Sequence, residues 1–78
     1  MSAQNEQKTL AVLARVSKRP LADLTPNKDL KADLDLGSAE ALELLATLED
    51  TLGIEISEVE AAKMRTVGDV LAFVKKAD

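Results

Sequence analysis

The chain has 78 residues, enough for one small domain, and contains neither His nor Cys. These absences exclude a His-based catalytic triad, a thiol nucleophile, disulfide bonds and Cys/His metal sites within the chain. The net charge of -4 and the single aromatic residue argue against nucleic acid as a partner, because nucleic-acid binding depends on Lys/Arg contacts and base stacking. We therefore expect a small helical domain that catalyses no reaction on its own.

The charges are unevenly distributed along the chain. Residues 1–28 hold two acids and five bases, a net charge of +3, and residues 61–78 hold two acids and four bases, a net charge of +2. Residues 29–60 hold ten acids and one base, a net charge of -9. Such a segment is either a solvated helix face or a surface that attracts basic partners.

Helical spacing of apolar residues predicts a first helix from about Ala3 to Lys18, which Pro20 terminates. Its expected inner face consists of Leu10, Leu13, Ala14 and Ser17. A long connection over residues 19–37 follows. Its recurring leucines indicate that it packs onto the helices and includes a short helical turn; they are Leu21, Leu24, Leu30, Leu34 and Leu36.

The second helix is predicted to begin at Ser38, acting as N-cap, and to run to about Thr51 before Gly53 stops it. Its expected inward stripe is Leu42, Leu45 and Leu48. Residues 54–56 are read as an extended linker with two buried Ile.

Two further capping patterns indicate two more helices. Ser57 with Glu60 is a capping box that opens a short third helix ending near Lys63. Residues 66–69 cap a fourth helix, whose core stripe is Val67, Val70, Leu71 and Val74. The predicted fold is all-α: one domain over residues 1–78, a small four-helix bundle with a long first loop and a short third helix. Residues 1–4 and 76–78 are expected to fray.

The acids before Gly37 suggest a calcium loop but do not form one. In an EF-hand the ligand positions one, three and five places before the Gly would be Leu36, Leu34 and Ala32. The acids fall between these positions, so no metal site is predicted. A loose divalent-ion site at Asp33, Asp35 and Glu40 stays open.

Ser38 is the most informative single position. It follows a glycine, lies at a predicted helix start and has acids on both sides. Backbone N–H groups at a helix N-terminus stabilise a phosphate, so Ser38 could carry a phosphodiester-linked group. The alternative is that it only caps the helix.

The first ten residues are polar and lack the pattern of a secretory signal, and no apolar stretch approaches the roughly 20 residues that span a bilayer. We expect a cytoplasmic protein that does not insert into membranes.

Residues 33–74 closely resemble the acyl carrier proteins of fatty-acid and polyketide synthesis. The motifs are the Ser at the start of the second helix, then ELLATLED, LGIEIS and TVGDV, in the family's order and spacing. The resemblance extends back to about Leu10. It implies that a phosphopantetheinyl transferase moves 4'-phosphopantetheine from coenzyme A onto Ser38. The thiol of this arm would hold acyl groups as thioesters, which suits a chain without Cys.

The resemblance also implies further site residues and partners. The acidic surface would dock acyl-transferring or condensing enzymes that have basic patches; its residues are Asp33, Asp35, Glu40, Glu43, Glu49 and Asp50. A sheltered acyl chain would contact Leu48, Ile56, Ala61, Met64, Leu71 and Phe73, which could equally be ordinary core. We expect a monomer that acts as a carrier and not as an enzyme.

The sequence departs from the family at the attachment motif. The usual Asp-Ser-Leu is Gly37-Ser38-Ala39, a bulky docking residue is replaced by Ala46, and a loop glycine is replaced by Asp35. These changes favour a specialised carrier in fatty-acid, lipid or polyketide-type biosynthesis. The alternative is an unmodified helical interaction module with the same fold.

Overall fold

The computed structural model describes residues 2–77; Met1 and Asp78 lie outside the described residues. Over this range the chain forms α1 (Ser2–Ser17), a 3₁₀ turn η1 (Leu21–Asp23), α2 (Ser38–Leu52), α3 (Glu58–Lys63) and α4 (Val67–Ala77). The predicted all-α fold, with its long first loop and short third helix, is confirmed. Residues 2–4 belong to α1 and residues 76–77 to α4, whereas the fraying expected at residues 1 and 78 falls outside the described range.

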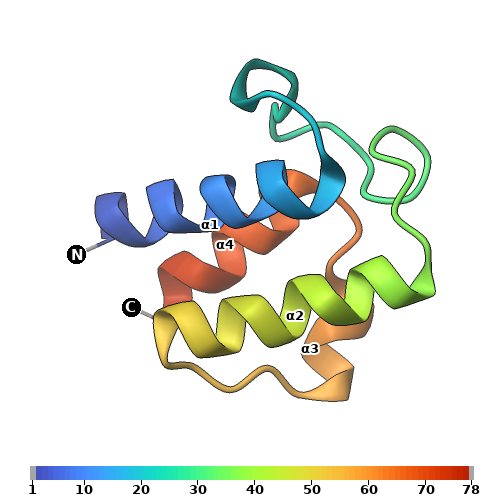
Figure 1. Ribbon diagram of the computed structural model, residues 1–78. Helices are drawn as coiled ribbons and strands as arrows, with labels where there is room; N and C mark the ends of the chain where they lie inside the picture. Colours follow the sequence, from blue (N-terminus) through green and yellow to red (C-terminus); the bar gives the residue numbers. More distant parts are fainter. Residues whose placement is uncertain (1, 78) are drawn as a thin grey trace.

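Helix α1 packs against both α2 and α4, and α3 lies beside the N-terminal half of α2 (Figure 1). The buried core lies between these helices and the first loop. Its apolar members are Val12, Leu13, Leu24, Leu30, Leu34, Leu36, Leu44, Leu48, Val67, Val70 and Val74.

The first loop supplies four of the core leucines, as the sequence predicted, whereas Leu21 in η1 is 60% exposed. Backbone hydrogen bonds also fasten the loop to the start of α4. The Val67 N–H donates to the Lys28 carbonyl at 3.0 Å, and the Gly68 N–H donates to the Pro26 carbonyl at 2.9 Å. The loop carbonyls thereby satisfy donors that a helix start leaves free.

The predicted inner faces of α1 and α2 are partly wrong. In α2 the buried leucines are Leu44 and Leu48, while Leu42 is 68% exposed. Apolar residues occupy more than one face of this helix, so their spacing alone does not show which face meets the core. In α1 the buried residues are Thr9, Val12 and Leu13, with Leu10 only half-buried.

The expected helix ends in the second half of the chain are confirmed. Gly53 ends α2 with a left-handed backbone (φ 65°). The Ser57 hydroxyl accepts from the Glu60 N–H at 3.2 Å, which caps α3. Within residues 2–77 the segment 54–56 forms no strand, and its two isoleucines are half-buried.

Candidate functional site

Ser38 is the first residue of α2 and does not cap it. The N-cap is Gly37, whose N–H donates to the Glu40 carboxylate (Oε1) at 3.1 Å. The predicted capping role of Ser38 is therefore wrong by one position, because Gly, which is also accepted at N-caps, takes it. The Ser38 side chain is exposed, and no hydrogen bond within residues 2–77 uses its hydroxyl. An exposed, uncommitted hydroxyl beside the free N–H groups of a helix start is chemically suited to carry a phosphodiester.

A half-open groove of about 1070 Å³ begins at Ser38. One wall is a stripe of α2 at helical spacing: Ser38, Ala41, Leu42, Leu45, Ala46 and Glu49. The facing wall is the segment from Ile56 through α3 to Arg65, and the first loop closes the groove with Asp29, Leu30, Lys31 and Leu36. The lining is mostly apolar, and the volume of the groove lies just above the roughly 300–1,000 Å³ typical of ligand pockets.

The six residues predicted to contact an acyl chain fall into two groups in the structure. Ile56, Ala61 and Met64 line the groove. Leu48 is fully buried in the core, and Leu71 and Phe73 of α4 pack against that core outside the groove lining. Sequence reasoning missed Leu42, Leu45 and Ala46 as groove residues. Their spacing from Ser38, with steps of three and four residues, was the signal that could have found them.

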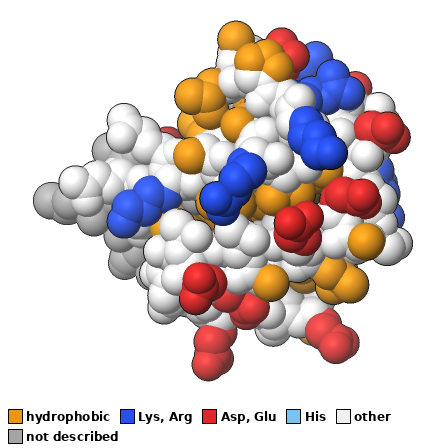
Figure 2. All heavy atoms as spheres, viewed as in Figure 1, with side chains coloured by type: hydrophobic (Ala, Val, Ile, Leu, Met, Phe, Trp, Pro, Cys, Tyr) orange, Lys and Arg blue, Asp and Glu red, His pale blue; other side chains and the backbone are white. Residues whose placement is uncertain are grey.

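The six predicted docking carboxylates are not equivalent. The carboxylates of Asp35, Glu43 and Asp50 are exposed and take part in no hydrogen bond within residues 2–77. The other three accept backbone N–H groups: Asp33 from Asp29 at 2.7 Å, Glu40 from Gly37 at 3.1 Å and Glu49 from Ile56 at 2.8 Å. In the view of Figure 2, acidic side chains gather over α2 and basic ones over α1 and the first loop.

Asp29 shapes the loop side of the groove. Its carboxylate (Oδ1) accepts the N–H groups of Ala32 and Lys31, each at 2.8 Å. These bonds, with a smaller contribution from Arg65 and Lys31 charges, hold the pKa of Asp29 below its usual value. The loop turn is therefore fixed by an ionised carboxylate at neutral pH.

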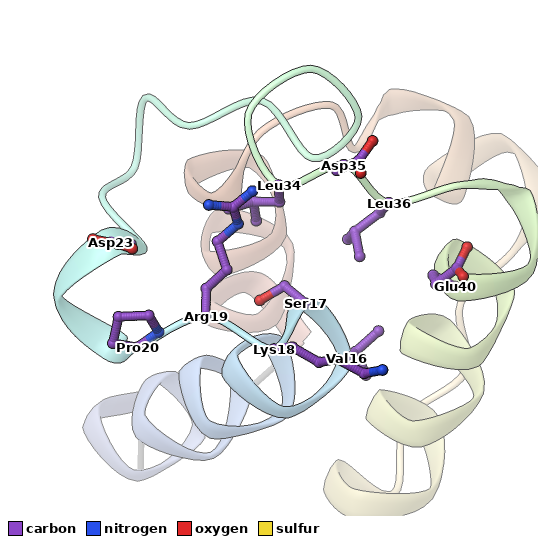
Figure 3. A pocket seen from close by; sticks show the side chains of 10 residues that line it. All are labelled: Val16, Ser17, Lys18, Arg19, Pro20, Asp23, Leu34, Asp35, Leu36 and Glu40. Carbon is purple, nitrogen blue, oxygen red and sulfur yellow. The ribbon is translucent and has the colours of Figure 1, made fainter.

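A second, smaller cavity of about 370 Å³ lies between the end of α1 and the start of α2 (Figure 3). Its lining is mostly polar and mixes cations and carboxylates, with Lys18 and Arg19 on one side and Asp35 and Glu40 on the other. Although Leu34 and Leu36 contribute apolar surface, the charged side chains make this cavity less suited to an acyl chain than the groove. Among residues 2–77 no group of three or more Asp/Glu side chains could hold a metal ion, and none of the helices found there is long and apolar enough to cross a membrane.

Residues 7–74 match the family described as "Phosphopantetheine attachment site". The chain belongs to this family of acyl carrier proteins. It is 32% identical to the meromycolate extension acyl carrier protein of Mycolicibacterium aurum, over 97% of this chain and 82% of that protein. It is 41% identical to the acyl carrier protein of Chlamydia felis, over 69% of each chain.

A solved structure shows the same fold. The acyl carrier protein from Enterococcus faecalis superposes with a TM-score of 0.85 at 26% identity, covering 100% of this chain and 99% of that one. This chain is thus an acyl carrier protein with a phosphopantetheine attachment site, a carrier and not an enzyme. Its family implies modification by a phosphopantetheinyl transferase and service to partner enzymes.

Proposed function

We propose that this carrier bears 4'-phosphopantetheine on Ser38. The observation that supports this most is the exposed Ser38 hydroxyl, which is free of hydrogen bonds within residues 2–77 and lies in the lining of the apolar groove. This Cys-free chain has no thiol of its own. When attached, the arm supplies a thiol that holds acyl groups as thioesters.

The surroundings of Ser38 favour a bound phosphate. Ser38 begins a 15-residue helix, whose N-terminal N–H groups and dipole attract negative charge. The preceding residue is Gly37, so no acidic side chain stands immediately before the attachment point. The nearby Glu40 carboxylate is engaged by the Gly37 N–H. The first turn of α2 would thus stabilise the phosphodiester.

We further propose that the groove receives the acyl chain. Its α2 stripe leads away from Ser38, so a chain tethered there could lie along apolar side chains without leaving the protein. Ile56, Ala61 and Met64 would contact the cargo directly. Leu48, Leu71 and Phe73 lie behind this surface and would join the pocket only if the helices part.

The exposed carboxylates of α2 and its flanks form the proposed docking surface for basic patches on transferring or condensing enzymes. Such docking is weak and screened by salt, which allows the carrier to exchange partners, while tethering raises the effective substrate concentration at each. The Gly37-Ser38-Ala39 motif and Ala46 remove apolar and charged groups from this surface. We therefore favour a specialised carrier in fatty-acid, lipid or polyketide-type biosynthesis, and the similarity to a carrier named for meromycolate extension supports this choice.

The test is intact-protein mass spectrometry after incubation with coenzyme A and a broad-specificity phosphopantetheinyl transferase. We expect the mass of one phosphopantetheinyl group to be added, and Ser38→Ala to abolish the addition. Ser57→Ala is the matched control, because Ser57 also stands at a helix start and should leave the modification intact. If several transferases add no mass to the folded protein, the unmodified interaction module is the better account.

A further inference from the structure

Glu49 differs from the carboxylates around it on α2. The carboxylates of Asp50 and Glu43 are exposed and accept no hydrogen bond within residues 2–77, whereas Glu49 is half-buried and lines the groove. Its carboxylate (Oε2) accepts the Ile56 N–H at 2.8 Å. This bond joins two residues on opposite walls of the groove.

The bond matters because the α3 wall is held mainly at its two ends, where Ile56 and Met64 pack against the core. Helix α3 has six residues and none of them is buried, and a helix this short is not stable by itself. Its C-terminal side is tied to the first loop, where the Leu30 N–H donates to the Arg65 carbonyl at 2.9 Å. On its N-terminal side, Ile56 immediately precedes the Ser57 cap. The Glu49 carboxylate therefore anchors the N-terminal side of this wall.

The position of Glu49 along α2 supports its role as an anchor for the α3 wall. It lies eleven residues after Ser38 on the same helical stripe, about 16 Å along the axis. The Glu49 backbone carbonyl also accepts the Ile54 N–H at 3.2 Å, so both its main chain and its side chain hold the returning segment. The groove is thus fastened at the end remote from the attachment serine.

We propose that Glu49 is a positioning residue that helps the groove to enclose an acyl chain and does not dock partner enzymes. Its carboxylate holds the Ile56 backbone, and through it the α3 wall of the groove; we call this contact the latch. The latch itself stands on the contact between Glu49 and Ile56, while its role in sheltering cargo rests on the proposed function. If Glu49 served only docking, its negative charge would be the property that matters. If it holds Ile56, the property that matters is a side-chain oxygen that accepts the Ile56 N–H.

Two variants separate these roles. Glu49→Gln and Glu49→Met both remove the charge and keep a side chain of similar length with good helix propensity, but only Gln retains an oxygen that can accept the Ile56 N–H. Asp50→Asn and Asp50→Met form the matched control pair at the adjacent exposed carboxylate. A melting curve for each variant confirms that it is folded at the assay temperature.

The first readout is amide hydrogen exchange at Ile56 in the unmodified chain, followed by NMR. We expect exchange about tenfold faster in Glu49→Met than in Glu49→Gln, since an unmade hydrogen bond leaves the N–H open to solvent. The Asp50 pair should not differ. Equal Ile56 exchange in Glu49→Met and Glu49→Gln would overturn the latch.

The second readout is cleavage of an octanoyl thioester on the modified carrier by hydroxylamine, with no partner enzyme present. We expect faster cleavage in Glu49→Met and near-wild-type cleavage in Glu49→Gln. Equal rates would overturn the role in shelter. If Ser38 accepts no arm, the proposed function fails, while the exchange comparison still decides whether Glu49 latches Ile56.

Discussion

Among residues 2–77, two residues other than glycine have a left-handed backbone, Lys18 with φ 60° and Asp35 with φ 56°, and both line the smaller cavity. This conformation costs roughly 1–2 kcal/mol for most L-residues, although Asp tolerates it better. We expect Lys18→Gly to raise the free energy of unfolding by about 1 kcal/mol, and Asp35→Gly by less. Chemical denaturation followed by circular dichroism measures both. Destabilisation by Lys18→Gly, comparable to that of Arg19→Gly next to it, would contradict the strain at Lys18.

The left-handed backbone also gives a physical meaning to one departure from the family pattern. The resemblance to acyl carrier proteins implies a glycine where this chain has Asp35, and the structure gives this position a positive φ, which glycine adopts without strain. Asp is one of the few residues with a side chain that fit there, so the fold is kept.

At the scale of elements, α4 begins with a reciprocal cap. The Asp69 N–H donates to the Thr66 hydroxyl at 3.1 Å, and the Asp69 carboxylate (Oδ2) accepts the N–H groups of Arg65 and Thr66 at 3.0 and 3.2 Å. The Arg65 N–H, followed by the bonds from Thr66, holds the pKa of Asp69 below its usual value. The same helix start receives the first loop, so this cap supports the contact between loop and bundle.

The lowered pKa of Asp69 predicts a pH-dependent stability. A carboxyl group with a depressed pKa in the folded state stabilises the fold above its unfolded pKa of about 3.9, and this contribution is lost as the pH falls through the folded value. We expect Asp69→Asn to lower the melting temperature at pH 7 and to melt like the wild type at the acid end of the titration. Thermal melts of both proteins between pH 7 and pH 2 measure the difference in melting temperature. A constant difference across that range would show that the charge of Asp69 is not involved, and Asp50→Asn controls for simple charge loss.

The helix ends were the most predictable elements, because capping acts within three or four residues of sequence. Ser57 with Glu60, Thr66 with Asp69 and the left-handed Gly53 all behave as their patterns indicate. The buried face of α2 was less predictable, since this helix has apolar residues toward both the core and the groove. Leu44 and Leu42 are distinguished only by what packs against them.

The candidate site was predictable in part for the same reason. Ser38 was singled out by its place after a glycine at a predicted helix start and by the resemblance of residues 33–74 to acyl carrier proteins, whereas the bond from Ile56 to Glu49 spans a chain reversal at Gly53. The spacing of acids on α2 does not distinguish the role of Glu49 from that of Asp50. The difference arises because residues 54–56 return along α2 and place the Ile56 N–H beside Glu49. Likewise, the groove wall supplied by the first loop depends on tertiary packing.

At the scale of the whole molecule, the net charge of -4 conceals a segment of residues 29–60 with ten acids and one base. Four of these acids lie on α2, and in the view of Figure 2 acidic side chains gather over that helix while basic side chains lie over α1. Interactions at such a surface are screened over about 8 Å at physiological salt. We propose that this uneven charge distribution, more than the net charge, orients the carrier toward a basic partner.

This polarity predicts the behaviour of charge-reversal variants. Glu43→Lys combined with Asp50→Lys should raise the KM of a phosphopantetheinyl transferase for this carrier on the order of tenfold at low salt, and should flatten the dependence of KM on salt. Glu6→Lys with Asp23→Lys changes the net charge equally from α1 and η1, and should leave KM close to that of the wild type. Equal effects of the two pairs would mean that the acids of α2 only solvate the surface.

We propose above that Ser38 carries the phosphopantetheine arm and its acyl cargo. Fragmentation mass spectrometry of the protein isolated from its native cell tests it most directly, because the experiment depends on no chosen transferase and reads both the modified residue and the attached acyl group. We expect a phosphopantetheinyl group on the peptide containing Ser38, with an acyl thioester on part of the population. Native protein that is unmodified at Ser38 throughout, or modified at another serine, would contradict it.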